Sequence, residues 1–208
     1  IEKIPDLEFL CFEEIYADKD FLANQHYVEH KGKFFYDWLV NYIASSPILF
    51  SIIRTKEENV KKIREILGPT LPEKAIKEAP NTIRALYGIM GGVNVAHASD
   101  AVETAKRESS IWAPHLKEKY GIDINSAKPE DVLLKIKEYI NRYIDYPIVD
   151  SARYRELLEE LKRDLSKRKE IEEHIAKLIA KETEQQFVNK NLHKILAKII
   201  IDNILLKK

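Results

Sequence analysis

Residues 82–108 read TIRALYGIMGGVNVAHASDAVETAKRE, and this stretch decides the fold. An apolar run of β type begins after Arg84, and we place a strand at residues 86–90. Gly91 and Gly92 follow, and glycine lets the chain turn through backbone angles that other residues avoid. The first half of the stretch therefore predicts a strand that ends in a tight turn.

The second half of the stretch places a histidine just before a helix. Ser99 and Asp100 favour an N-cap, so we expect the helix from residue 101 onward. His97 lies two residues before the cap, where backbone N–H groups and the helix dipole favour an anion such as phosphate. A lone loop histidine is usually just solvated, so its neighbours must decide whether it has a catalytic role.

The rest of the first half alternates strands and helices. Hydrophobic periodicity and turn residues predict a strand at 7–13, a helix at 18–27 capped by Asp18, a helix at 34–44, a buried strand at 48–53, an amphipathic helix at 56–67 and a long connection at 69–80. This order, with the strand at 86–90 and the helix after it, is of α+β type.

The chain changes character after Pro114 and becomes predominantly helical. The expected helices cover residues 129–146, a long charge-rich stretch from 151 onward, and residues 192–206. The apolar stripe of the long helix is interrupted near Arg168, and no metal-ligand spacing occurs in this half. We therefore divide the chain into a domain at 1–117 and an α-helical extension at 118–208, which packs on the core or on another subunit.

The composition excludes several classes of protein. The 208 residues include 34 basic and 34 acidic side chains, so nothing favours bulk binding to nucleic acid or to a membrane. Cys11 is the only cysteine, which excludes an internal disulfide and suits a reducing, cytoplasmic location. No signal peptide or membrane span is visible in the sequence.

Several segments resemble, in order, the motifs of the nucleoside diphosphate kinase family. NVAHASD at 94–100, with ETAKRE after it, resembles the signature N-x-x-H-x-S-D with a Glu further along the helix. The other matching segments are HY at 26–27 with HKGKFFY at 30–36, SSP at 45–47, REILGPT at 64–70 and APNTIR at 79–84. Five ordered motifs are far more specific than any one of them. The resemblance covers roughly residues 1–112 and implies a ferredoxin-like βαββαβ sandwich.

The resemblance implies that the chain moves the γ-phosphate of a nucleoside triphosphate to a nucleoside diphosphate through a phosphohistidine on His97. It puts Glu108, Ser99 and Tyr27 in the catalytic set with His97, and in the family this Glu fixes the tautomer of the ring. It implies a nucleotide site in which Arg64, Thr70 and Arg84 clamp the phosphates, Asn94 contacts the sugar, and Phe35 stacks on the base beside Leu39. Mg²⁺ would come with the phosphates without a protein cage, and family members are usually hexamers or tetramers, so we expect a homo-oligomer.

The sequence also departs from the family pattern. Ala85 follows the arginine where the family has Gly, Ala98 follows the histidine where the family has Gly, and Ser46 stands before Pro47 in place of Gly. The family opens with a strand that carries Lys-Pro-Asp-Gly and is central in its sheet, and this chain begins after it. Because a sheet without that strand leaves edges uncovered, we expect either residues upstream of Ile1 or a rearranged remnant.

Other interpretations of the same residues remain open. Phe35 and Leu39, four residues apart, would ordinarily be core residues, and Arg64 beside two lysines could belong to a solvated helix face. The remaining histidines form no spaced cluster, so surface or boundary positions are expected for His26, His30, His115, His174 and His193. The alternative function is a catalytically impaired relative that serves as an oligomeric interaction or assembly module.

Overall fold

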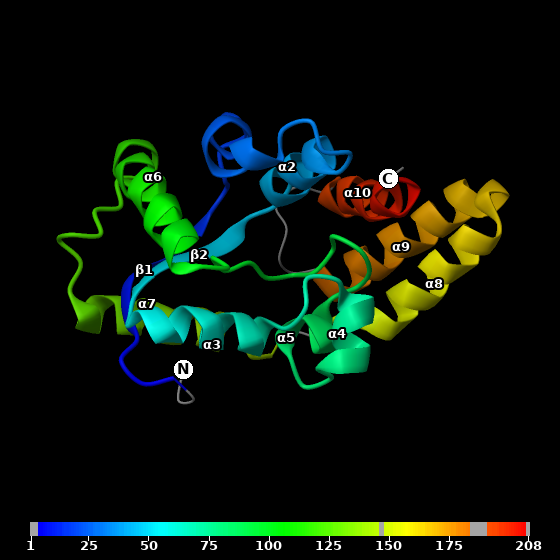
Figure 1. Ribbon diagram of the computed structural model, residues 1–208. Coiled ribbons are helices and arrows are strands. Elements are labelled where there is room, and N and C mark those ends of the chain that lie inside the picture. Colours follow the sequence, from blue (N-terminus) through cyan, green and yellow to red (C-terminus); the bar gives the residue numbers. More distant parts are fainter. Residues whose placement is uncertain (1–3, 146–147, 184–190, 207–208) are drawn as a thin grey trace.

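The computed structural model describes residues 4–145, 148–183 and 191–206, which combine a small sheet with many helices (Figure 1). The sheet has two antiparallel strands, β1 (Glu8–Ile15) and β2 (Ile48–Arg54). Both strands were predicted from the sequence and are confirmed. The arrangement is mixed α/β, as expected.

The helices predicted in the first third of the chain lie close to their predicted positions. They are α1 (Lys19–Phe21), which continues as the π-helical turn η1 (Leu22–His26) and the 3₁₀ turn η2 (Val28–His30), then α2 (Tyr36–Ala44) and α3 (Glu57–Leu67). The carboxylate of Asp18 accepts the N–H of Phe21 at 2.8 Å and caps α1, as predicted. These helices could be predicted from local sequence signals, namely a cap residue and a regular apolar face.

The predicted strand at 86–90 is wrong. The structure instead has α4 (Pro72–Glu78) inside the expected long connection, followed by the short helix α5 (Ile83–Tyr87), and these two helices contact each other. A short apolar run does not distinguish a strand from a buried helix by periodicity alone. Here the helix is favoured because it carries Arg84 inward, where its guanidinium donates to backbone carbonyls.

A long helix follows the His97 segment and does not begin as predicted. α6 (Val102–Tyr120) starts after Ala101 without a side-chain cap, so the expected cap by Ser99 and Asp100 is wrong. The hydroxyl of Ser99 is engaged elsewhere, as a donor to a carboxylate. The helix continues through Pro114 and ends at Tyr120, with Gly121 as its cap. It thus crosses the predicted domain boundary between 117 and 118, which stays a prediction.

One apolar core joins the sheet to α6. Cys11 of β1 and Ile52 of β2 are buried with Trp112 and Leu116 of α6. The register of the strands shifts between Phe9 and Cys11, which marks a β-bulge. The Cys11 thiol is free, and its burial raises its pKa. The apolar face of α6 is therefore packed against the sheet, and this packing fixes the direction in which the polar side chains of α6 project.

The extension contains more helices than predicted. They are α7 (Pro129–Tyr143), α8 (Ser151–Arg163), the 3₁₀ turn η3 (Leu165–Lys167), α9 (Arg168–Thr183) and α10 (Leu192–Leu205). The single long helix expected from residue 151 is wrong, because the backbone is extended at Asp164 and α9 turns back to contact α8. The expected end of the first of these helices, at 146, lies outside the described residues.

The extension packs on the first half of the chain, one of the two possibilities that the sequence left open. Trp38 of α2 and Val93 share a core with apolar residues of α8, α9 and α10. α10 lies beside α2 (Figure 1). On the other side of the molecule, α7 covers β1, and the Tyr139 hydroxyl accepts the N–H of Glu14 at 2.9 Å. No helix in the described part of the chain is long and apolar enough to span a membrane.

Candidate active site

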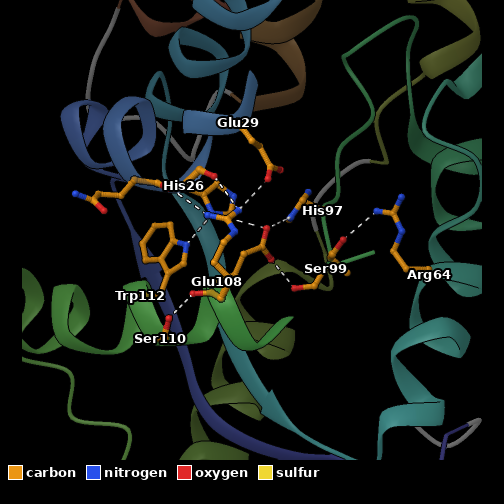
Figure 2. A network of polar contacts seen from close by, with 11 residues as sticks. His26, Glu29, Arg64, His97, Ser99, Glu108, Ser110 and Trp112 are labelled. Carbon is orange, nitrogen blue, oxygen red and sulfur yellow. Dashed lines mark hydrogen bonds and ion pairs between the residues drawn. The ribbon is translucent and has the colours of Figure 1, made fainter. Parts of the chain in front are cut away.

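The polar centre of the molecule is a carboxylate flanked by a histidine and a serine (Figure 2). Glu108 projects from α6, and its Oε1 lies 3.5 Å from Nε2 of His97. The Ser99 hydroxyl donates to Oε2 at 2.5 Å. Burial opposes the ionisation of Glu108, yet the hydrogen bonds from His97 and Ser99 lower its pKa to about 2. Glu108 is therefore an anion at neutral pH.

This contact has a chemical consequence for the imidazole. A carboxylate beside Nε2 favours the tautomer of His97 that carries its proton on that nitrogen, which leaves a lone pair on Nδ1. The His97 side chain is 46% exposed, so a ligand can approach it from solvent. An oriented, accessible imidazole of this kind is suited to nucleophilic attack.

A second histidine lies behind Glu108. Nδ1 of His26 is 3.9 Å from Oε1 of Glu108 and accepts the indole N–H of Trp112 at 3.1 Å. Burial lowers the pKa of His26 to about 4, so the ring is neutral at physiological pH. The expectation that His26 occupies a surface or boundary position is wrong. Trp112 follows Glu108 by four residues and shares its helix face, but no local pattern shows that His26, 86 residues earlier, packs against them.

Three of these side chains lie close enough together to be considered as metal ligands. Ligand atoms of His26, His97 and Glu108 lie within 4.8 Å of one another, a group that the sequence analysis did not expect. The lone pair of His26 Nδ1 is, however, already engaged by Trp112, and Mg²⁺ prefers oxygen ligands, of which this group offers one carboxylate. The group is thus better suited to orienting an imidazole than to holding Mg²⁺.

Two arginines fix the backbone on either side of His97. Nη1 of Arg64 donates to the carbonyl of Ala98 at 2.9 Å, and Arg84 donates to the carbonyl of Ala96 through Nη2 at 2.8 Å and Nε at 3.2 Å. Arg84 also donates to a carbonyl of the turn after α3 and is only 2% exposed. Burial and the charge of Arg64 lower the pKa of Arg84 to about 10. Positive charge therefore lies close to His97, which favours an anionic ligand there.

The remaining predicted residues lie at increasing distances from the imidazole. The buried ring of Tyr27 is centred 6.4 Å from that of His97 and stacks on His30, whose ring lies 5.6 Å from Phe35. A row of rings thus leads from His97 toward the start of α2. Leu39 of that helix packs against both apolar cores. This position is compatible with a core residue and with a residue that borders the base.

A further pair of predicted residues is joined by a hydrogen bond. The side-chain amide of Asn94 donates to the carbonyl of Thr70 at 3.0 Å. The loop after α3 and the His97 segment are therefore held together. Two cavities, of about 490 and 610 Å³, lie elsewhere, beside α3 and between β1 and the start of α7, and neither includes His97.

Comparisons with known proteins identify the family of the chain. The sequence pattern of the family described as "Nucleoside diphosphate kinase" matches residues 6–117, more than half of the chain. The chain belongs to the nucleoside diphosphate kinase family. Family membership and the α/β arrangement agree with the expected α+β fold with a helical extension.

The similar curated proteins are named nucleoside diphosphate kinase. The protein of Chloroflexus aurantiacus is 43% identical over 95 residues, which are 45% of this chain and 61% of that relative. The protein of Staphylococcus epidermidis is 45% identical over 91 residues, 44% of this chain and 58% of the relative. The protein of Pelotomaculum thermopropionicum is 46% identical over 106 residues, 50% of this chain and 68% of the relative. The chain thus spans about 61% of the length of the first of these relatives.

Two solved structures are also similar. The nucleoside diphosphate kinase of Aquifex aeolicus is 32% identical with a TM-score of 0.47. The matched region covers 51% of this chain and 74% of the chain from Aquifex aeolicus. The nucleoside diphosphate kinase of Encephalitozoon cuniculi is 26% identical with a TM-score of 0.48. The matched region covers 65% of this chain and 80% of the chain from Encephalitozoon cuniculi.

Proposed function

We propose that the chain is a phosphotransferase of the nucleoside diphosphate kinase type, which moves the γ-phosphate of a nucleoside triphosphate to a nucleoside diphosphate through a phosphohistidine on His97. The observation that carries the proposal is the contact between His97 and the buried anion Glu108, with Nδ1 left open. Names of the similar curated proteins support the same activity.

In the first half-reaction, Nδ1 of His97 attacks the γ-phosphorus and forms an N–P bond. The bond between that phosphorus and the β,γ-bridging oxygen breaks, and the nucleoside diphosphate leaves with the oxygen. The Nε2 proton stays on the ring, and the carboxylate of Glu108 stabilises the positive charge that the ring gains. In the second half-reaction, a terminal oxygen of an acceptor nucleoside diphosphate attacks the same phosphorus and frees the imidazole.

The rest of the proposed site follows the same reaction. Ser99 orients Glu108, and Tyr27 borders the ring. Arg64 and Arg84 supply positive charge, and Thr70 and Asn94 contact the phosphates and the sugar. Phe35 and Leu39 receive the base. Mg²⁺ arrives with the nucleotide phosphates, and the chain works as a homo-oligomer.

Incubation with γ-labelled ATP tests the proposal directly. The native chain is expected to take up label that is lost in acid and kept in alkali, as a phosphoramidate requires, and His97→Gln is expected to take up none. His174→Gln, a change at an exposed histidine of α9, is the matched control and should label like the native chain. Label retained by His97→Gln would move the reaction to another residue. A folded native chain that takes up no label would overturn the proposal and favour the alternative, an impaired relative that acts as an assembly module.

A further inference from the structure

The turn that precedes the His97 segment is held from two sides. The N–H of Gly91 donates to the carboxylate of Glu73 on α4, at 3.1 and 3.2 Å to its two oxygens. The N–H of the next residue, Gly92, donates to the side-chain oxygen of Asn203 at 3.2 Å. Asn203 belongs to α10, so the extension supplies one of the two fixed points of this turn.

Glycine is required at both positions because neighbouring side chains leave no room for a Cβ. Gly91 has a φ of +58°, and a Cβ there would lie 2.2 Å from the side-chain oxygen of Asn203. A Cβ on Gly92 would lie 2.4 Å from the ring of Trp38. The Trp38 indole in turn donates to the carbonyl of Ile199 in α10 at 2.8 Å. α10 and α2 thus close on the turn together, and Figure 1 shows the two helices side by side next to this segment.

Single hydrogen bonds connect the turn to His97. The N–H of Asn94 donates to the carbonyl of Gly92 at 2.9 Å, and the N–H of Ala96 donates to the carbonyl of Asn94 at 2.8 Å. The intervening residue, Val95, has a φ of +63°, which a β-branched residue adopts only when its surroundings impose it. These backbone hydrogen bonds join the turn to Ala96, whose carbonyl Arg84 holds next to His97, so Asn203 and Arg84 hold the two ends of one short segment.

We propose that Asn203 is a positioning residue for the segment 91–97, so that α10 of the extension sets the place of His97. The inference rests on the proposed function for its catalytic consequence, but the positioning itself does not depend on it. It gives the extension a role in the active site that the family pattern, which ends near residue 117, does not contain.

The test compares three variants of the full chain. Asn203→Ala removes the acceptor for the Gly92 N–H, whereas Asn203→Asp keeps an acceptor oxygen in the same place. Lys198→Ala, an exposed change on α10, is the control. Two quantities are measured: the rate of His97 labelling at several ATP concentrations, per folded molecule, and hydrogen exchange of the backbone amides at 91–97.

Asn203→Ala is expected to slow labelling at saturating ATP about tenfold with little change in the half-saturating ATP concentration, because a misplaced nucleophile loses rate rather than binding. Amide exchange at 91–97 should rise in the same variant. Asn203→Asp should restore both values, and Lys198→Ala should match the native chain. A merely structural role would lower the folded fraction without changing the rate per folded molecule.

The outcomes separate the two proposals. Native exchange and native labelling in Asn203→Ala would overturn the positioning role, as would equal defects in Lys198→Ala. Absence of label in the native chain together with faster exchange in Asn203→Ala would support the positioning role and overturn the proposed function.

Discussion

Two neighbouring regions of this protein are held in place by opposite means. Residues 88–101, which carry His97, contain neither helix nor strand, and side chains from α3, α4, α5, α8 and α10 fix their backbone through hydrogen bonds. The helices α8, α9 and α10 are instead held by apolar side chains with no exposed surface, namely Leu158, Leu161, Ile175, Ala197 and Ile201.

The difference shows how geometry and stability divide within one chain. Hydrogen bonds are directional, and each adds little net stability, about 1 kcal/mol, so the His97 segment gains a defined shape rather than strength. The free energy gained by burying apolar surface does not depend on orientation and increases with the buried area, so the helices supply most of the stability. Substitutions in the two regions should therefore separate loss of stability from loss of activity.

The largest effect is expected from a deletion of volume in the helical region. Leu158→Ala leaves a cavity at a residue that is 0% exposed and should lower the free energy of unfolding by about 3–4 kcal/mol. Urea unfolding followed by circular dichroism measures it. The His97 labelling rate per folded molecule should stay native. Leu165→Ala, at a residue that is 61% exposed, should change stability by less than about 0.5 kcal/mol, and equal losses in the two variants would contradict the division.

A smaller loss of stability is expected when the hydrogen bonds that hold the His97 segment are removed. Arg84→Met keeps much of the buried side-chain length but leaves two carbonyls without their donor, at a cost of about 2–3 kcal/mol. Arg64→Met removes one hydrogen bond from a half-buried site and should cost about 1 kcal/mol. Urea unfolding of both variants gives the comparison. If Arg64→Met proved the more damaging, the buried guanidinium would not be the main support of this backbone.

The smallest effect is a pH dependence that originates at His26. Its pKa is lowered from 6.5 to about 4 in the folded chain, so the unfolded chain takes up a proton first as the pH falls. This contribution to stability is complete above pH 6.5 and is lost between pH 6.5 and 4, at no more than about 1.4 kcal/mol per pH unit. His26→Gln keeps an acceptor for Trp112 and removes the titration.

Unfolding free energies at pH 7 and pH 5 measure this difference. The native chain should lose more stability between the two values than His26→Gln does, because both share the contributions of the other ionisable groups and only the native chain has His26. Parallel losses would show that His26 does not titrate as its burial requires.

The sequence predicts the fold well where the signal is local. The strand now seen as β2 and the helix α3 have a clear apolar pattern, and Asp18 is a recognisable cap. It fails at residues 86–90, because a buried arginine that reaches distant carbonyls selects a helix there. The sequence-based prediction fails again at Asp164, where α8 ends and where the carboxylate accepts the N–H of Ser166 and caps η3, a cap that could have been recognised.

The candidate site shows the same division. The resemblance to the family implies a contact between His97 and Glu108, and the structure brings these two side chains together. The environment of His26 could not be predicted in the same way, because its burial depends on an element more than 80 residues later in the chain. Asn203 was missed for the same reason, since no local pattern marks an amide that meets a turn 111 residues earlier.

The contact of α7 with β1 has a consequence beyond the active site. The N–H of Glu14 points away from β2 and donates to the Tyr139 hydroxyl, so the helix lies over the outer edge of the strand. An uncovered edge is a template on which strands of other molecules can add and aggregate. α7 therefore occupies a place along β1 where a further strand would otherwise be able to pair.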